Sequence, residues 1–394
     1  MPDYLQTLKQ NVLDHLDWYM SAVEEMYYNP EVGNQEFKSM ALLAGMLKKE
    51  GFDVETGFVV PTGFIGKFDS GLPGPTIAFL CEYDALPEVG HGCGHNLIAG
   101  IGVGAGVALK SIIGGLGGKV WVIGTPAEEN FGGKVSMAEA GVFDHVDAAM
   151  MIHPSTKNGL GGRTNALNPV KFEFFGKNAH GCRPHEGKSA LDAAVLTFTN
   201  INFLRQFCLP NTFIHGIFRD GGLAANVIPA YASLEYYFRG ATMPYVQELT
   251  QKAIKCAEGA CIATGTTFKH SIYECPYDDF VINYTLADLL RQQYEALGLS
   301  DIEAVREQPV GSSDIGSVSY RCPALHGYIK IADACVAGHS REMADATISP
   351  DGRAALLNSA SALANLGALL ISEPDVLNSV KKEFLESIHK LKAN

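Results

Sequence analysis

The sequence has little positive charge, and it has no long uninterrupted apolar run. Lys and Arg number 30 against 43 Asp and Glu, which gives a formal net charge of −13. An acidic chain without a basic cluster is poorly suited to binding nucleic acid or an anionic membrane. A membrane helix needs about 18–20 apolar residues, and the closest stretch, residues 97–118, is glycine-rich and interrupted by Lys110 and Ser111. We therefore expect neither a nucleic-acid partner nor a membrane span.

The sequence also lacks the marks of a secreted protein. Residues 1–20 are amphipathic and charged, without the apolar core of a signal peptide. The nine cysteines are scattered along the chain, and an odd, scattered set favours reduced thiols over a disulfide framework. These features predict a cytoplasmic protein.

The chain is long enough, and apolar enough, for more than one core. It has 394 residues, of which 47% are hydrophobic and 19% are charged. That length suggests about two domains. No polar tract indicates extended disorder.

Three apolar runs alternate with helical patterns in the first part of the chain. Residues 76–81, 120–124 and 148–152 are continuous and apolar, as strands buried on both faces are. A glycine-rich helical pattern over about 95–113 separates the first two, and its glycines are suited to close packing on a sheet. The alternation predicts an α/β fold with a mixed, largely parallel sheet and flanking helices.

Polar residues follow each of these runs. Glu82 and Asp84 follow the first, Glu128 and Glu129 the second, and His153 the third. Ligands of such sheets bind beyond the carboxyl ends of the strands. The three clusters therefore predict one site assembled from distant segments.

The pattern changes after about residue 165. Strand and helix signals follow in the order β-α-β-β-α-β, which is typical of a ferredoxin-like unit. We expect residues 166–278 to form an inserted dimerisation or lid domain. Residues 1–165 and 279–394 would then form the catalytic, metal-binding domain.

The run His91-Gly-Cys-Gly-His-Asn96 carries a metal-binding signature. A thiolate, imidazoles and carboxylates together suit zinc or a similar divalent ion. Cys93 and His95 can face one ion only outside a regular helix, and the surrounding glycines permit this. A lone Cys or His is usually structural, but adjacent Glu128 and Glu129 allow one ligand and one general base, as a hydrolase needs.

The motifs together resemble those of the peptidase M20 family. The resemblance rests on motifs spread over nearly the whole chain, including Glu82–Pro87, HGCGHN (91–96), PAEE (126–129) and IHP (152–154). It continues through residues 176–194, 221–240 and 311–320. The Cys-Gly-His form marks the amidohydrolase branch, and within it the chain is most similar to the dipeptidase-like group of M20 domain-containing protein 2.

The resemblance implies a role for each site residue. It implies two divalent metal ions per subunit, zinc or manganese, with five ligands: Cys93, His95, Glu129, His153 and His339. Glu128 matches the general base that takes a proton from the bridging water, and Asp84 matches a carboxylate that orients a ligand. His180 and Asn226 match residues that stabilise the oxyanion in the partner subunit's active site. Arg239 matches the residue that binds the substrate carboxylate.

Three residues depart from the pattern, and one of them is His339, since the family usually has Thr or another residue near that position. Glu82 stands where many family members carry a metal-binding His, although the amidohydrolase branch has an acid there. His91 lies close to the metal ligands in sequence but matches none of them, and we expect it either to support a ligand or to be structural.

The resemblance implies a homodimeric hydrolase that cleaves a dipeptide or an N-acyl or aryl amino acid with a free carboxylate. The acyl side stays open, so a deacylase remains an alternative to a dipeptidase. A non-catalytic binding protein with the same fold is a second alternative. A cysteine hydrolase that uses Cys93 is a third, although the Cys-x-His spacing is tight for a nucleophile and its base.

Overall fold

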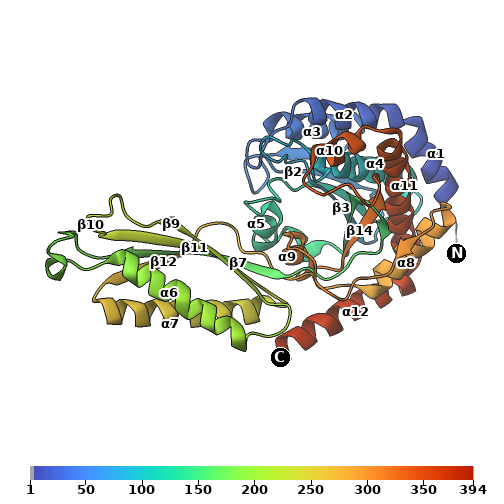
Figure 1. The fold of residues 1–394 in the computed structure, drawn as a ribbon. Helices are drawn as coiled ribbons and strands as arrows, with labels where there is room; N and C mark the ends of the chain where they lie inside the picture. The colour runs from blue at the N-terminus through green and yellow to red at the C-terminus, as the bar shows by residue number, and fades with distance from the viewer. Residues whose placement is uncertain (1–3, 394) are drawn as a thin grey trace. The chain divides into compact units, whose positions relative to one another are not determined.

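The computed structural model describes residues 4–393, which divide into two compact units. Unit 1 extends to Arg163, continues as Phe280–Gln308 and resumes at Asp314. Unit 2 comprises Thr164–Asp279 and the short return segment Pro309–Ser313. Both are shown in Figure 1.

Unit 1 is built on an eight-stranded sheet of order β1-β2-β4-β3-β5-β14-β6-β13. Its strands are β1 (Asp53–Thr56), β2 (Phe64–Asp69), β3 (Thr76–Cys81), β4 (Lys119–Gly124), β5 (Ala148–Ser155), β6 (Asn158–Gly159), β13 (Ile302–Glu303) and β14 (Ala324–Lys330). The four central strands, β4, β3, β5 and β14, are parallel to one another. This confirms the predicted largely parallel sheet.

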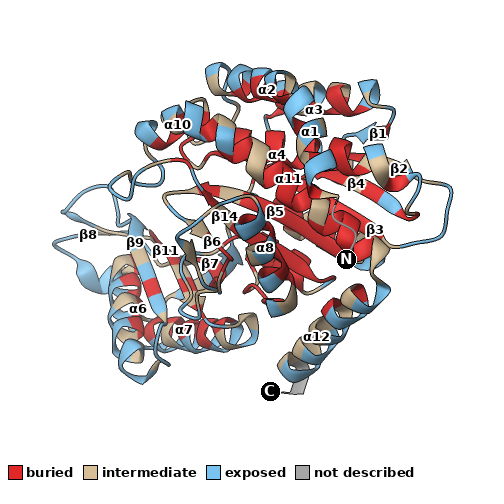
Figure 2. Ribbon diagram, turned by 90° about the vertical axis from the view of Figure 1, so that its right-hand side faces the viewer, coloured by how far each residue is buried: buried red, intermediate tan, exposed pale blue. Residues whose placement is uncertain are grey.

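Helices cover both faces of this sheet. They are α1 (Leu5–Asp14), α2 (Leu16–Tyr28), α3 (Phe37–Lys49), α4 (His95–Ile113), α5 (Gly133–Glu139), α8 (Tyr284–Ala296), α9 (Ile315–Ser319), α10 (Arg341–Thr347), α11 (Pro350–Ser372) and α12 (Pro374–Ala393), with a short 3-10 turn at Val142–His145. Alternate residues of β3 enter two cores: Ile77 and Phe79 one, Ala78 and Leu80 the other. All six β3 residues are buried, which explains the continuous apolar run (Figure 2).

Helix α4 packs closely on the sheet, as its glycines predicted. A Cβ at Gly102 would lie 2.5 Å from the Cys81 sulfur, and one at Gly106 would lie 2.2 Å from a Val122 methyl carbon. Larger residues at these two positions would push the helix away from β3 and β4. The start of α4, which carries His95, would move with it.

Two helices correct the expectation that no segment is long and apolar enough to span a membrane. By length and composition, α4 and α11 both pass that test. In each, 83% of the apolar window is buried inside the protein. The two helices pack against each other in the core of unit 1, and this burial accounts for their composition.

Unit 2 has the predicted ferredoxin-like order. Its elements are β7 (Ala166–Phe175), β8 (Ala179–His180), α6 (Ala190–Leu204), β9 (Phe213–Asp220), β10 (Val227–Ile228), β11 (Tyr231–Gly240), α7 (Met243–Thr264) and β12 (Thr267–Ile272), with 3-10 turns at Pro184–Glu186 and Arg205–Phe207. The main sheet is antiparallel, in the order β12-β7-β11-β9. Helices α6 and α7 pack on it around their own core. Strands β8 and β10 form a separate two-stranded sheet.

Candidate metal centre

The site lies where the central parallel strands of unit 1 end. Glu82 follows β3, and Glu128 and Glu129 follow β4. His153 lies inside β5, which continues to Ser155 beyond its predicted end, and His339 lies in the loop after β14. Because these strands are adjacent and parallel, the segments that follow them meet at one edge of the sheet.

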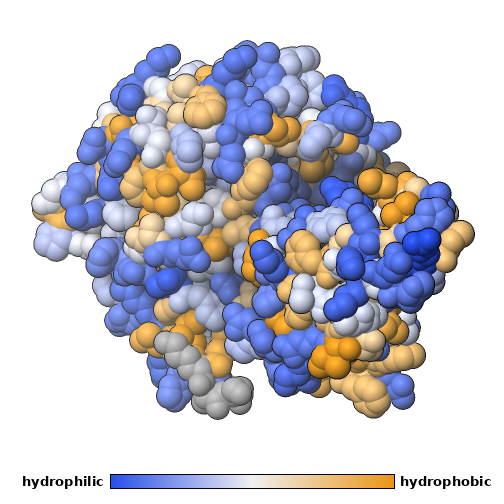
Figure 3. Space-filling model, turned by 90° about the vertical axis from the view of Figure 1, so that its left-hand side faces the viewer, coloured by the Kyte–Doolittle hydropathy of each residue, from blue (hydrophilic) through white to orange (hydrophobic). Residues whose placement is uncertain are grey.

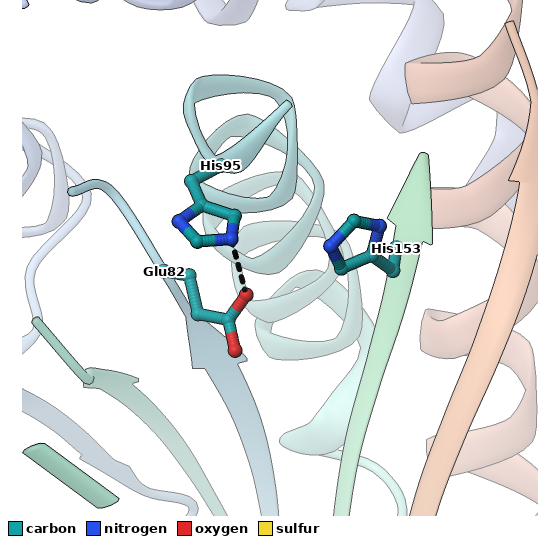
Figure 4. Close-up of side chains that lie close together, drawn as sticks. All are labelled: Glu82, His95 and His153. Carbon is teal, nitrogen blue, oxygen red and sulfur yellow. Dashed lines mark ion pairs between the residues drawn. The ribbon is translucent and has the colours of Figure 1, made fainter. Parts of the chain in front are cut away.

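The potential ligands form two adjoining triplets. Glu82, His95 and His153 make the first, which we call the inner triplet (Figure 4). Cys93, Glu129 and His339 make the outer triplet. Within each, one ligand atom per residue lies within 4.8 Å of the others. The structure thus brings together all five predicted ligands and adds Glu82.

Asp84 orients two members of these triplets. One carboxylate oxygen lies 2.9 Å from His95 Nδ1, and the other accepts a hydrogen bond of 3.0 Å from the Glu129 amide. His95 Nε2 is left to face Glu82 Oε2 at 3.4 Å and Glu129 Oε1 at 4.0 Å. Burial raises the pKa of Asp84, but His95 outweighs burial and keeps that pKa below its ordinary value.

His153 is held in the same manner. Its Nδ1 lies 2.7 Å from the Pro154 carbonyl oxygen, so it donates there, and Nε2 is available as a ligand atom. The ring meets that of His95 edge-on, with centroids 5.7 Å apart. Burial lowers the pKa of His153 and favours the neutral form that binds metals.

The outer triplet depends on two left-handed backbone positions. Gly94, between Cys93 and His95, has φ 80°, and it lets Cys93 precede α4 while His95 is its first residue. The Cys93 sulfur and the His339 Nε2 lie 2.6 and 4.0 Å from Glu129 Oε1. His339 itself has φ 58°, and its amide donates to the Gly92 carbonyl oxygen at 3.1 Å.

Cys93 is poorly placed to act as a nucleophile. Burial and the adjacent Glu129 carboxylate both raise the pKa of its thiol. An attacking cysteine needs a lowered pKa. A divalent ion, by contrast, would displace the thiol proton and bind between Cys93 and Glu129.

Glu36, which the sequence did not single out, supports the turn that carries both glutamates. Ala127 adopts a strained φ of 61°, and its amide donates to Glu36 Oε1 at 2.9 Å. Glu36 Oε2 accepts from the Thr62 hydroxyl at 2.8 Å. Glu36 lies 91 residues from Ala127 in the chain, and no local motif connects them.

A buried lysine lies beneath the inner triplet. Lys134 Nζ is 2.6 Å from Glu82 Oε1 and 2.7 Å from Asp314 Oδ1. All three side chains are at most 1% exposed. Glu128 adjoins this group, with a carboxylate oxygen within 4.8 Å of those of Glu82 and Asp314. Burial, followed by these two carboxylates, raises the pKa of Glu128 well above its ordinary value.

Two further histidines lie close to the site without joining either triplet. His91 is buried, and neither of its ring nitrogens has a hydrogen-bond partner among the described residues. His326, on β14, lies behind His153 with ring centroids 5.9 Å apart. Burial lowers the pKa of each to about 3. Both are therefore neutral near pH 7.

The remaining candidates, His180, Asn226 and Arg239, lie in unit 2. His180 pairs with Val227 across the β8–β10 sheet, and Gly181 donates to the Asn226 carbonyl oxygen at 2.7 Å. His180 and Asn226 are both exposed, and their main chains lie close together at this sheet.

Arg239 lies at the other end of unit 2. It pairs with Leu167 near the end of β11. Strand β10 of the two-stranded sheet comes just before the other end of β11, which begins at Tyr231. Eight strand residues span about 27 Å. Within one chain, the structure does not bring Arg239 together with His180 and Asn226.

The donor set fits two divalent ions. Sulfur, imidazole nitrogen and carboxylate oxygen together suit zinc and related metals. The ring nitrogens of His95 and His153 are oriented by outer partners, as those of metal ligands usually are. The inner triplet also contains a buried carboxylate oxygen, Glu82 Oε2, that accepts no hydrogen bond from the described residues.

Comparison with known proteins supports the same chemistry. The family described as Peptidase family M20/M25/M40 matches residues 78–360. The Xaa-Arg dipeptidase of Mus musculus is 36% identical, over 96% of this chain and 93% of that protein. A p-aminobenzoyl-glutamate hydrolase component of Escherichia coli (strain K12) is also 36% identical, over 71% of this chain and 62% of that protein.

A solved structure shares the fold. It is a dinuclear metal-binding peptidase of the M20 family from Bacillus subtilis, with a TM-score of 0.64. The match covers 90% of this chain and 99% of that one at 19% identity. The arrangement of sheet and helices is thus that of a known metallopeptidase fold.

Proposed function

Because the chain belongs to Peptidase family M20/M25/M40 and is a hydrolase of peptide or amide bonds, we propose that it cleaves a dipeptide or an N-acyl or aryl amino acid. The observation that carries the proposal is the pair of triplets beside Glu128. The names of two relatives, Xaa-Arg dipeptidase and p-aminobenzoyl-glutamate hydrolase, support a small substrate that contains an amino acid.

The proposed ligands are Cys93, Glu129 and His339 for one ion, and His95 and His153 for the other. Zinc or manganese would suit this set. When bound, such ions lower the pKa of water and polarise the amide carbonyl. Asp84 keeps His95 Nε2 and the Glu129 carboxylate pointed at the two positions.

Glu128 is the proposed general base. Its carboxylate takes a proton from the attacking water and delivers it to the nitrogen of the leaving amine. Burial and the neighbouring carboxylates raise the pKa of Glu128, which makes its carboxylate a stronger base than a free one for taking the proton from water. Glu129, its neighbour, is held by Asp84 and does not share this role.

The proposed substrate contacts come from unit 2. Arg239 binds the free carboxylate with its planar guanidinium, and its Nε has no hydrogen-bond partner among the described residues. His180 and Asn226 stabilise the oxyanion in the partner subunit of a homodimer. The separation of these two from Arg239 along β11 supports action across subunits.

The test is the substitution Glu128→Gln, which preserves shape and removes the base. We expect kcat to fall by about 10²–10⁴, while metal analysis of the purified variant still shows two ions per chain. The substrate panel would contain Xaa-Arg dipeptides, N-acetyl amino acids and p-aminobenzoyl-glutamate. A variant with wild-type kcat would rule out the proposed base.

The panel also separates the two substrate classes. A dipeptidase would hydrolyse dipeptides with a kcat/KM at least about tenfold above that for N-acyl or N-aryl amino acids. A deacylase would show the reverse order. Amidated dipeptides serve as the control, because loss of the free carboxylate removes the proposed contact with Arg239.

A further inference from the structure

We propose that Glu82 is a ligand of the inner metal position and that Lys134 holds its carboxylate in place. This inference rests on the proposed function, since it concerns the same pair of ions. It adds a sixth protein ligand and a positioning residue to the five ligands and the base already named.

The two oxygens of Glu82 have different surroundings. Oε1 is held by Lys134 Nζ at 2.6 Å. Oε2 accepts no hydrogen bond from the described residues, although Glu82 is only 1% exposed. It lies 3.4 Å from His95 Nε2. A Glu82 carboxylate oxygen and a ring nitrogen each of His95 and His153 lie within 4.8 Å of one another. Figure 4 shows the three side chains facing one another. Oε2 forms an ion pair with His95 when that ring is protonated, and a metal ion bound to His95 would take the place of that proton beside Glu82.

Coordination number gives a second argument. Zinc in a catalytic site takes three protein ligands and keeps one position for water or substrate. The outer position has three from Cys93, Glu129 and His339, whereas the inner position has two histidines. Glu82 Oε2 brings the inner position to three.

Charge gives a third argument. Asp314 binds Lys134 through both carboxylate oxygens. Oδ1 pairs with Nζ, and Oδ2 accepts a hydrogen bond of 3.0 Å from the Lys134 main-chain amide. Glu82, Asp314 and Lys134 together carry a net charge of −1 with at most 1% exposure. Asp314 alone is enough to neutralise the charge of Lys134. Neutralising that lysine therefore does not explain why Glu82 is buried beside it as well. On the far side of Glu82 this negative charge is balanced by His95 when its ring is protonated, and by a bound metal ion when His95 is a neutral ligand.

Metal titration of Glu82→Gln tests the proposal. Gln keeps the shape of Glu82 but is a much weaker, neutral ligand. By competition with a chelating dye, we expect wild type to bind two zinc ions, and Glu82→Gln to retain one and bind the other at least about tenfold more weakly. Asp314→Asn is the matched control, because it disturbs the same Lys134 network without removing a ligand, and it should keep both ions. Two ions bound by Glu82→Gln at wild-type affinity would overturn the proposal.

A second measurement needs no variant. In crystals of zinc-loaded wild type, anomalous scattering should place an ion about 2.0–2.2 Å from Glu82 Oε2. A separation beyond about 3 Å would overturn the assignment even if Glu82→Gln failed to fold. Protein that binds two ions in this way but hydrolyses nothing would contradict the proposed function and leave Glu82 as a ligand. Active protein whose ions avoid Glu82 would contradict only this inference.

Discussion

Glu36 stabilises the strained turn before Glu128 while being a buried acid itself. Burial raises its pKa from 4.5 to about 7, and hydrogen bonds from Thr62 and Ala127 limit the rise. Between these two pH values the folded chain keeps a proton that the unfolded chain has lost. The unfolding free energy should therefore fall as pH rises from about 4.5 to about 7.

We predict that Glu36→Gln removes this part of the pH dependence. The side-chain oxygen of a glutamine can accept from the Ala127 amide, as Glu36 Oε1 does, and its NH2 group can donate to the Thr62 hydroxyl, which here donates to Glu36 Oε2. The variant should match wild type at pH 5 and exceed its unfolding free energy by about 2–3 kcal/mol at pH 8.5. Urea denaturation with chelator at both pH values measures the difference.

The control is Glu31→Gln, which alters a carboxylate that accepts hydrogen bonds from Lys38 and Ser39 at the start of α3, away from Ala127. Its difference from wild type should not grow between pH 5 and 8.5. Equal differences for Glu36→Gln at both pH values would show that Glu36 is ionised throughout the range.

At the scale of elements, strands buried on both faces were the most predictable. The runs that became β3 and β4 lie within about a residue of their predicted ends, because continuous apolar sequence reflects burial on both faces. Apolar residues at helical spacing over residues 4–28 predict one continuous helix, but the structure has two, α1 and α2, separated at His15. The His15 ring lies 2.8 Å from the Asn11 carbonyl oxygen, a local interaction that helical periodicity does not reveal.

The site was predictable where its residues follow strands or form a short motif. Cys93, His95, Glu129 and His153 all do so. Glu36 and Lys134 were not predicted, because their partners are distant in sequence: Lys134 and Asp314 are 180 residues apart. Contacts of that kind depend on the completed fold, and a single sequence carries no local signal for them.

The β9 edge is the most apolar exposed edge of unit 2. Among the described strands β9 pairs only with β11, and Phe213, Ile217 and Phe218 are 44%, 54% and 41% exposed. Figure 3 shows apolar side chains gathered in several places on the face of the molecule that it presents. An unpaired apolar edge is a ready surface for a second strand. We therefore expect the proposed homodimer to form there.

Ile217→Lys should convert the proposed dimer to a monomer. The side chain is exposed in one chain, so the fold should be little affected, while a charge buried at the interface is costly. Light scattering after size-exclusion chromatography measures the mass. The control is Ile272→Lys on β12, the opposite edge, which is 48% exposed. A dimer that survives Ile217→Lys but not Ile272→Lys would place the interface on β12.

At the scale of the whole molecule, a site shared between subunits allows complementation. A Glu128→Gln chain keeps His180, and a His180→Ala chain keeps Glu128. If His180 acts in the partner's site, a heterodimer of the two has one complete site. We predict that two nearly inactive variants, mixed one to one and allowed to exchange, recover about a quarter of wild-type activity, since half of the dimers are mixed.

Mixing each variant with itself is the control and should recover nothing. Mixing Glu128→Gln with Asp84→Asn should also fail, because both residues lie in unit 1 beside the same ligands. No recovery with His180→Ala would place His180 in the site of its own chain, and recovery with Asp84→Asn would show that Glu128 and Asp84 do not act in the same site.

The position of β14 has a consequence during synthesis on the ribosome. Strand β5 pairs with β14 on one side, yet β5 ends at Ser155 and β14 ends at Lys330, with nearly all of unit 2 encoded between them. Translation at about 5–20 residues per second leaves this apolar edge open for on the order of ten seconds or more. During that interval unit 2 can fold while the nascent first sheet stays incomplete. Until β14 is made, the unpaired edge of β5 can pair with other chains. We therefore expect chains truncated before β14 to aggregate through this edge, and nascent chains to need chaperones that cover it.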